Sequence, residues 1–402
     1  MVGWLTQQLD RPHPGTYLGK GKIEELKQMV ADKQVSLIIF DDELSPSQGK
    51  NIEEAIGTRV LDRAELILDI FAVRARSSEA KMQVELAQLE YTLPRLTRMW
   101  THLEKFRGGI GVRGPGETQL ETDRRLINHR IKLLKERLAH VQQNRAVQRQ
   151  SRADAFKASI VGYTNAGKSS ILRGMTGALD VHVEDRLFAT LDPLTREVDL
   201  GENAHVLLTD TVGFIRKLPH HLVASFRATL EETRDADLLL HTVDASHPLW
   251  EEQRSVVDQV LVELGLAEQP TLLVFNKMDL LSEDAALALQ VRVTALVPNA
   301  VFVSAEAEHG LDPLRRALRQ AMRARRPVAE IRLLPTQGKL LAEIHQHGEV
   351  LDQSSEEEVM VVRARVTDKL RGRLEQAGVD VRLESATSTS QTTAPQRQSV
   401  QL

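Results

Sequence analysis

The sequence of 402 residues contains no cysteine. This absence excludes disulfide bonds, thiolate nucleophiles and metal sites held by cysteine, and it is compatible with a reducing compartment. No apolar run approaches the roughly 18 residues that a membrane-spanning helix needs. The N-terminus lacks a basic segment followed by an apolar core, so no secretory leader is predicted. We therefore expect a cytoplasmic protein without an integral membrane segment, with peripheral attachment to a membrane as the alternative.

The chain as a whole also lacks a large excess of either charge, because it contains 52 Lys and Arg and 56 Asp and Glu. A net charge of -4 gives no support for a DNA-binding protein, so any basic surface has to be local. One segment is one-sided, since residues 124–152 hold a single acid, Glu136. Its nine cations are Arg124, Arg125, Arg130, Lys132, Lys135, Arg137, Arg145, Arg149 and Arg152. This pattern indicates either a solvated helix face or a surface for RNA or another polyanion.

The hydrophobic pattern divides the chain into five regions. Alternating helix and strand patterns predict a small α/β domain at residues 1–75 and a larger α/β domain at 154–326. Residues 76–153 are predicted to form a helical hairpin with a glycine-rich tip loop at 108–116. A small α+β domain is expected at 330–385, with strands near 359–362 and 379–383 around a helix at 367–376. The Ser/Thr/Gln-rich residues 386–402 are expected to be disordered.

The hairpin prediction rests on two apolar stripes with helical spacing. Met82, Leu86, Leu89, Leu93 and Leu96 are spaced by four and three residues, and a second stripe follows after the glycine-rich loop. Two such stripes favour an antiparallel helix pair, and Pro94 is expected to kink or restart the first helix. As an RNA-contact hypothesis, basic residues would follow a phosphate backbone at Lys105, Arg107, Arg113, Arg124 and Arg125. The loop has no aromatic residue on which bases could stack, which favours contact with backbone or folded RNA.

A phosphate-binding loop is predicted at residues 162–169, between an apolar strand at 158–161 and the start of a helix. The loop fits the pattern of Gly, four residues and then Gly-Lys-Ser, in which backbone N–H groups and a helix N-terminus surround a polyphosphate. Lys168 would reach the β and γ phosphates. The predicted binding residues of this loop are Gly162, Tyr163, Thr164, Asn165, Ala166, Gly167, Lys168, Ser169 and Ser170.

Two further segments predict a magnesium ion beside this loop. The strand at 205–209 ends in Asp210-Thr211-Val212-Gly213, a DxxG sequence in which Asp210 would hold Mg²⁺ and the Gly213 N–H would reach the γ-phosphate. Thr190 is the candidate switch threonine that completes the metal shell only with a triphosphate. Ser169, Thr190 and Asp210 are thus the predicted metal ligands.

The base-reading residues are predicted to follow two later strands. Asn276-Lys277-Met278-Asp279 comes after the strand at 271–275 and forms an NKxD sequence. Guanine presents two adjacent donors that the Asp279 carboxylate can accept together, whereas adenine does not. Asn276 could tie this sequence to the phosphate loop, Lys277 could lie along the base, and the N–H of Ala305, next to Ser304, would meet guanine O6.

Together these stretches resemble the HflX family, within the Obg-like group of phosphate-loop GTPases. The resemblance rests on residues 162–169, on 187–193, on 210–215 and above all on 108–125, which lie outside the GTPase motifs, and it extends from about residue 10 to 326. It implies an α/β fold class: a phosphate-loop, Ras-like GTPase domain preceded by a small α/β domain with a long antiparallel helical hairpin, and followed by a small α+β domain.

The resemblance also implies a function, namely a monomeric GTPase that binds the large ribosomal subunit and its RNA and that splits or rescues stalled ribosomes. A GTP-gated assembly or RNA-binding factor, in which hydrolysis only times release, is the alternative. A phosphate-loop ATPase or kinase is a third possibility, against which Asp279 argues.

The catalytic groups are predicted to be Lys168, Thr190 and Gly213. Phe214 occupies the position at which Ras-like enzymes place a water-orienting glutamine, so the intrinsic rate is expected to be of order 10⁻³ s⁻¹ or below and to be raised by the ribosome. Asn165 either helps to hold a potassium ion or closes the loop by a hydrogen bond.

Overall fold

In the computed structural model, the chain divides into two compact units. The first combines Met1–Arg152 with Phe156–Arg315, and the second combines Ala153–Ala155 with Arg316–Leu402. The described residues are 2–8, 10–96, 116–150, 155–177, 188, 190–201, 204–216, 233–356 and 359–384. The predicted tip loop, apart from Gly116, and the predicted disordered tail lie outside them. The five predicted domain boundaries stay predictions.

The N-terminal part of the first unit is a small α/β arrangement, as predicted. Its elements are α1 (Lys20–Asp32), β1 (Leu37–Ile39), α2 (Pro46–Ile56), β2 (Arg59–Leu61) and α3 (Arg63–Arg74). The two strands pair in parallel, with Ile38 opposite Val60. Apolar residues from one face of α1, among them Ile23 and Leu26, pack with these strands and with Ile52 of α2 in one buried cluster. The helical spacing in α1 therefore produces its buried face.

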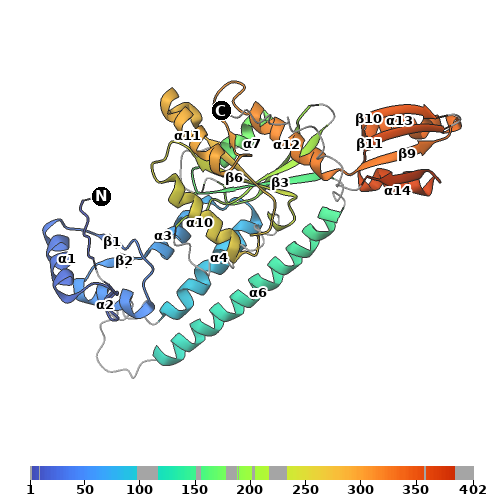
Figure 1. Cartoon of the computed structure of the whole chain (residues 1–402). Helices are drawn as coiled ribbons and strands as arrows, with labels where there is room; N and C mark the ends of the chain where they lie inside the picture. Colours follow the sequence, from blue (N-terminus) through green and yellow to red (C-terminus); the bar gives the residue numbers. More distant parts are fainter. Residues whose placement is uncertain are drawn as a thin grey trace, which may run out of the picture. The chain divides into compact units, whose positions relative to one another are not determined.

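A helical hairpin follows and confirms the sequence prediction. It consists of α4 (Ser78–Thr92), the 3₁₀ turn η1 (Leu93–Arg95) around Pro94, and the long α6 (Gly116–Gln150). The two α-helices lie side by side and run in opposite directions (Figure 1), and Leu86, Leu134 and Leu138 form their buried seam. Pro94 lies in η1, where α4 gives way to the tighter turn, as its missing N–H requires.

Among the cations of the basic segment whose side chains the structure describes, Arg130, Lys132 and Lys135 are in ion pairs. Arg130 forms a bidentate pair with Glu85, at 2.7 and 2.9 Å. Lys135 lies 2.8 Å from Glu90, and Lys132 lies 4.0 Å from Glu136 on its own helix. The pairs of Arg130 and Lys135 join α6 to α4, so part of the positive charge helps to hold the hairpin together.

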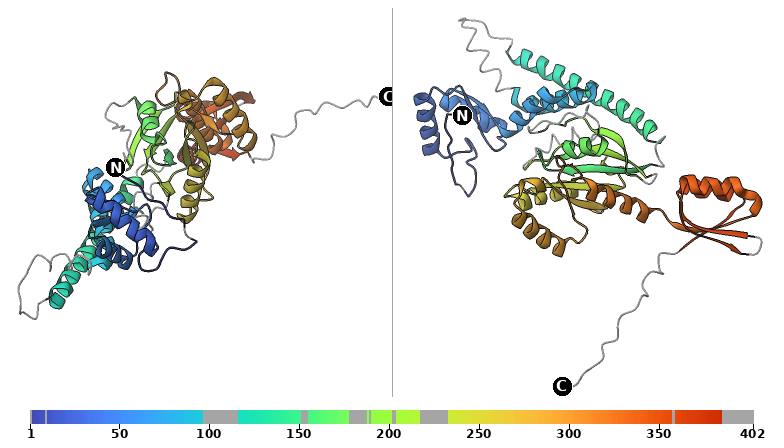
Figure 2. Two further views of the ribbon diagram at one scale, coloured as in Figure 1. Left: turned by 90° about the vertical axis from the view of Figure 1, so that its left-hand side faces the viewer. Right: turned by 90° about the horizontal axis from the view of Figure 1, so that it is seen from above.

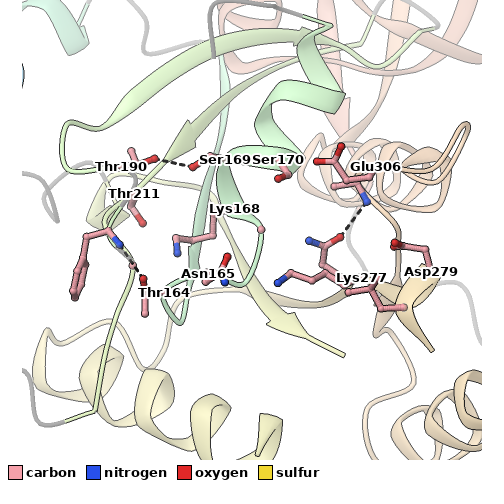
Figure 3. A pocket seen from close by; sticks show the side chains of 16 residues that line it. Thr164, Asn165, Lys168, Ser169, Ser170, Thr190, Thr211, Lys277, Asp279 and Glu306 are labelled. Carbon is pink, nitrogen blue, oxygen red and sulfur yellow. Dashed lines mark hydrogen bonds between the residues drawn. The ribbon is translucent and has the colours of Figure 1, made fainter. Parts of the chain in front are cut away.

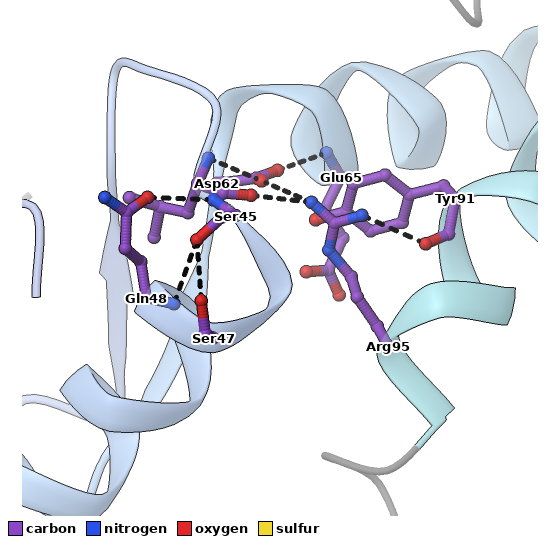
Figure 4. A network of polar contacts seen from close by, with 8 residues as sticks. Ser45, Ser47, Gln48, Asp62, Glu65, Tyr91 and Arg95 are labelled. Atoms are coloured by element: carbon purple, nitrogen blue, oxygen red, sulfur yellow. Dashed lines mark hydrogen bonds and ion pairs between the residues drawn. The ribbon is translucent and has the colours of Figure 1, made fainter. Parts of the chain in front are cut away.

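The far end of α4 is fastened to the start of α3 by a buried arginine (Figure 4). Arg95 Nη2 donates to the Leu44 carbonyl at 2.7 Å and lies 3.5 Å from Asp62 Oδ2. Asp62 also caps α3, because its Oδ1 accepts from the backbone N–H of Glu65 at 2.9 Å. The Arg95 guanidinium lies 3.6 Å from the centre of the Tyr91 ring, and burial raises the pKa of Tyr91. Removing the charge of Arg95 or of Asp62 would leave the other charge shielded from water without its partner. The contact therefore joins α3 and α4 into one structural element, the α3–α4 wedge.

A six-stranded sheet forms the centre of the first unit, in the order β4-β5-β3-β6-β7-β8. Only β4 is antiparallel to its neighbour. The strands are β3 (Phe156–Gly162), β4 (Leu194–Asp199), β5 (His205–Asp210), β6 (Leu238–Asp244), β7 (Thr271–Asn276) and β8 (Val301–Phe302). The described helices of this part are α7 (Lys168–Thr176), α10 (Trp250–Glu263), η2 (Met278–Leu280), α11 (Glu283–Leu296) and the start of α12 (Asp312–Arg325). Because the carboxyl ends of parallel strands meet at one edge, the motifs after β3, β5 and β7 converge there.

The second unit is an antiparallel α+β arrangement, as predicted. Its elements are β9 (Val328–Leu333), η3 (Pro335–Gln337), α13 (Gly338–His347), β10 (Glu349–Glu356), β11 (Val359–Arg365), α14 (Asp368–Gln376) and β12 (Asp380–Leu383). The strand order is β10-β11-β9-β12. Ile344 of α13 and Leu374 of α14 pack on the Ile331 side of the sheet, so both helices cover one face (Figure 2). The strands β9 and β10 were not predicted individually.

Candidate nucleotide-binding site

A pocket of about 330 Å³ opens at the edge of the central sheet where the motifs converge (Figure 3). Its lining brings together 12 of the predicted nucleotide-binding or metal residues: Thr164, Asn165, Gly167, Lys168, Ser169, Ser170, Thr190, Gly213, Asn276, Lys277, Asp279 and Ala305. The other predicted residues are not among those that line it: Gly162, Tyr163, Ala166, Asp210 and Ser304. Each of these five bonds to a lining residue through a contact described below.

The phosphate loop surrounds the Lys168 side chain. Lys168 Nζ donates to the carbonyl oxygens of Tyr163 at 3.0 Å and Gly162 at 3.3 Å. Burial lowers the pKa of Lys168 to about 8, while the nearby Asp210 opposes this shift. Gly167 has a φ of +88°, and a Cβ there would lie 2.1 Å from Asn276 Nδ2, so only glycine permits this approach.

Three side-chain oxygens meet at the predicted metal position. The Ser169 and Thr190 hydroxyls donate to Asp210 Oδ2 at 2.7 and 2.8 Å, and the two hydroxyl oxygens are 2.7 Å apart. The other carboxylate oxygen, Asp210 Oδ1, is buried without a hydrogen-bond partner. Burial raises the pKa of Asp210, opposed chiefly by Lys168. An all-oxygen set with an unused buried carboxylate oxygen fits Mg²⁺, which prefers hard oxygen ligands.

The base side of the pocket is joined to the phosphate loop by Asn276. Its Nδ2 donates to the Ala166 carbonyl at 3.0 Å, and its Oδ1 accepts from the Ala305 N–H at 3.1 Å. The Ala305 N–H, which the sequence assigns to guanine O6, thus has an internal partner in this structure. The Asp279 N–H donates to Ser304 Oγ at 3.0 Å, which fixes the backbone that carries the Asp279 carboxylate.

Sequence reasoning missed two acidic residues of this region, namely Glu306, which lines the pocket, and Asp244. Asp244 ends β6, and its Oδ2 lies 2.7 Å from Lys277 Nζ. Lys277 has a φ of +65°, and the ion pair holds its side chain over the strand ends. Asp244 is paired in register with Asn276 on β7. The sequence holds one signal for Asp244, because it is an acidic residue at the C-terminal end of the apolar run 238–243. This run precedes the strand that leads into the NKxD sequence.

Phe214 points away from the pocket. Its side chain is only 2% exposed and packs in a core cluster with Val161 and Leu239. Its backbone is paired with the phosphate loop, because Phe214 N donates to Gly162 O at 3.0 Å and Thr164 N donates to Phe214 O at 2.7 Å. The side chain after Gly213 therefore cannot orient a water molecule, as the sequence predicts.

The predicted RNA-contact residues are only partly within the described chain. Arg124 and Arg125 lie exposed on α6, whereas Lys105, Arg107 and Arg113 lie outside the described residues.

Within the part of the chain that the structure describes, no helix is long and apolar enough to cross a membrane. The same residues contain no group of three or more His, Cys, Asp or Glu that could bind a metal.

Three family models match the chain, one after the other. They are described as GTP-binding GTPase N-terminal, at residues 1–72, GTP-binding GTPase Middle Region, at 74–152, and 50S ribosome-binding GTPase, at 157–277.

Similar proteins include the GTPase HflX of Caldanaerobacter subterraneus, 44% identical over 93% of this chain and 86% of that protein. The GTPase HflX of Escherichia coli is 47% identical over 85% of this chain and 80% of that protein. Among solved structures, a GTP-binding protein from Sulfolobus solfataricus in complex with GDP is 27% identical, with a TM-score of 0.42 over 78% of this chain and 88% of that chain. With both relatives matched over most of their length, the chain belongs to the HflX family of GTPases.

Proposed function

We propose that the protein binds GTP together with Mg²⁺ in the pocket at the sheet edge and hydrolyses it to GDP and phosphate. The observation that carries this proposal is the convergence, in one pocket, of the phosphate loop, the Ser169–Thr190–Asp210 oxygen cluster and Asp279. The phosphate loop and Lys168 would hold the phosphates, and Ser169, Thr190 and Asp210 would hold the metal. When bound, Mg²⁺ supplies positive charge that stabilises the transferring phosphoryl group.

Hydrolysis would depend on how the phosphates are positioned and on the positive charge around them. Phe214, the residue after Gly213, points away from the pocket and has no group that could orient water. A Cβ at Gly213 would lie 2.8 Å from Thr164 Cα and 3.0 Å from Lys168 Nζ, so its backbone is in direct contact with the phosphate loop. Its N–H can therefore donate to a γ-phosphate held by that loop. Without a water-orienting side chain, slow intrinsic turnover is expected, with acceleration by a partner.

We assign the large ribosomal subunit as that partner, supported by the family model that matches residues 157–277. Exposed Arg124 and Arg125 on α6, with Lys105, Arg107 and Arg113 at the tip, would contact ribosomal RNA. Splitting or rescue of stalled ribosomes is the proposed outcome. In sucrose-gradient sedimentation, whole ribosomes should separate into subunits with protein and GTP. Intact ribosomes at every protein concentration would favour the alternative of a GTP-gated assembly factor.

Single-turnover GTP hydrolysis with and without purified large subunits tests the enzyme proposal. We expect a low rate for the protein alone and a rate at least about tenfold higher with large subunits, in line with partner-stimulated GTPases. Small subunits at the same concentration are the control. An equal rate under all three conditions would contradict a ribosomal partner and leave a GTPase without an identified activator.

Asp279→Asn tests the base assignment. The asparagine side chain presents a donor to the guanine amino group, so GTP affinity should fall by at least about a hundredfold because polar groups are left unmatched. Xanthosine triphosphate carries a carbonyl in place of that amino group and should bind the variant better than GTP. Fluorescence titration measures both affinities. Loss of GTP binding without any gain of xanthosine triphosphate binding would contradict the assignment of Asp279 to base recognition.

For Asn165 we propose a potassium contact. It belongs to the phosphate loop and lines the pocket, with a φ of +62°. A loop-closing hydrogen bond is the competing explanation. Turnover in KCl should exceed turnover in NaCl, and Asn165→Ala should abolish the difference. Equal turnover of the unmodified protein in the two salts would remove the potassium proposal.

A further inference from the structure

Both segments that flank the oxygen cluster are packed against the α3–α4 wedge, outside the central sheet. Phe188 and Leu191 from the Thr190 segment and Val212 from the DxxG segment are each at most 7% exposed. They share one core cluster with Phe71 of α3 and Ala80 of α4. The apolar surface that surrounds Thr190 is therefore supplied largely by helices that carry none of the nucleotide-binding motifs.

The first fixed point of the Thr190 segment is Phe188. Its ring packs edge-on against the Phe71 ring, with centroids 4.7 Å apart and planes at 83°, and both rings are almost fully buried. Phe188 has a φ of +55°, a conformation that costs a bulky residue of order 1 kcal/mol or more and persists only where packing enforces it. Its N–H also donates to Oγ1 of Thr164, a residue of the phosphate loop, at 3.1 Å.

The second fixed point is Asp192. Its carboxylate accepts hydrogen bonds from the backbone N–H of Ser77 at 3.1 Å and from the Ser77 hydroxyl. Ser77 is the N-cap of α4, where its Oγ also accepts from the Ala80 N–H at 3.0 Å. A carboxylate at a helix N-terminus is further stabilised by the helix dipole. The contact joins residues 115 positions apart in sequence.

Thr190 lies midway between these two fixed points, two residues from each. We propose that Ser77 and Phe71 are positioning residues for Thr190, holding its hydroxyl at Asp210 and so favouring the triphosphate-bound state; this rests on the proposed function. The DxxG side is tied to the same wedge, because Arg63 Nη2 at the start of α3 donates to the Arg216 carbonyl at 2.8 Å. Thr190 then leaves the metal position only when its segment also separates from α3 and α4.

This coupling has a reciprocal consequence. If the wedge favours the triphosphate, then a triphosphate must favour the wedge contacts by the same free energy. The Arg95–Asp62 contact fixes the other end of α4, the end that leads to the predicted tip loop, to the start of α3. Backbone hydrogen exchange at residues 74–80 should therefore be slower with a non-hydrolysable GTP analogue than with GDP.

Three substitutions at one position separate positioning from helix capping. Ser77→Asp keeps a good N-cap but places a second carboxylate against Asp192. Ser77→Thr keeps both the cap and the hydroxyl contact. Ser77→Ala loses both, and Ser45→Ala, which removes the N-cap of α2, is a matched control for lost capping. Affinities for GDP and for a fluorescent non-hydrolysable GTP analogue are measured for each, together with thermal unfolding.

Ser77→Asp should weaken the triphosphate analogue about tenfold, a typical coupling between two sites, while GDP affinity is unchanged. Ser77→Thr should match the unmodified protein, and Ser45→Ala should lower the unfolding temperature without altering the ratio of the two affinities. An unaltered ratio in Ser77→Asp would overturn the inference and leave the proposed function intact. Failure of the unmodified protein to bind either nucleotide would instead contradict the proposed function.

Discussion

At the scale of single residues, Asp244 offers a test of how the base side is held. Its ion pair with Lys277 is largely shielded, with side chains 12% and 24% exposed. Asp244→Ala should weaken GTP and GDP equally, by about tenfold, because one charge-assisted hydrogen bond is lost on the side away from the γ-phosphate. Fluorescence titration with both nucleotides measures this.

Glu251→Ala is the control for Asp244, because Glu251 lies on α10 and pairs with Arg292 at 3.0 Å, outside the pocket lining. It should leave both affinities unchanged. A selective loss of GTP in Asp244→Ala would contradict the assignment of Asp244 to the base side. The equal loss expected here also contrasts with the GTP-selective loss expected for Ser77→Asp.

Pocket residues could be predicted from the sequence where they belong to one contiguous motif with a fixed spacing. The phosphate loop, from Gly162 to Ser169, is contiguous, and its spacing alone indicates what each residue could contact. Asp244 and Ser77 were missed because their partners are set by tertiary neighbours. Asp244 meets Lys277 only because β6 lies beside β7, and Ser77 meets Asp192 only because α4 begins against the Thr190 segment.

At the scale of elements, the hairpin seam is a buried leucine interface. Leu134 of α6 is 0% exposed, whereas Leu126 on the same helix is 59% exposed. Leu134→Ala should lower the free energy of unfolding by about 3 kcal/mol, because a buried side chain leaves a cavity. Leu126→Ala should change it by at most about 0.5 kcal/mol.

Chemical denaturation followed by circular dichroism measures both leucine variants. A similar small effect for the two would mean that the seam contributes little and that α6 is held mainly by its ion pairs with Glu85 and Glu90. A difference in the denaturant slope between variants would instead indicate that the hairpin unfolds separately from the sheet.

Element prediction succeeded where the apolar period was unambiguous. The two stripes predicted the hairpin, and Pro94 correctly marked the break after α4. β9 escaped individual prediction although its buried residues Ala329, Ile331 and Leu333 alternate as in a half-buried strand. β10 carries mostly polar residues, Glu349–Glu356, and gives no such pattern. Such strands acquire their pairing from neighbours distant in sequence, which a local pattern does not encode.

At the scale of the whole molecule, the first unit carries both the candidate nucleotide pocket and the helix α6 that is proposed to contact RNA. Ion pairs already occupy Arg130, Lys132 and Lys135, so the basic segment presents less free charge than its composition indicates. The proposed RNA contact then depends on the exposed pair Arg124 and Arg125 and on the tip. Binding to the large subunit should be strongly salt-dependent, since each phosphate contact releases counterions.

The double substitution Arg124→Ala and Arg125→Ala tests this surface. Binding to isolated large subunits is measured by co-sedimentation over a series of salt concentrations, with a non-hydrolysable GTP analogue present throughout. The slope of log affinity against log salt should become shallower by about 2, one for each lost phosphate contact. Lys132→Ala with Glu136→Ala is the control, because it removes one cation and one anion from the same helix and should leave the slope unchanged. If the double arginine variant keeps the full slope, the charge of α6 serves the hairpin and the contact with RNA lies elsewhere.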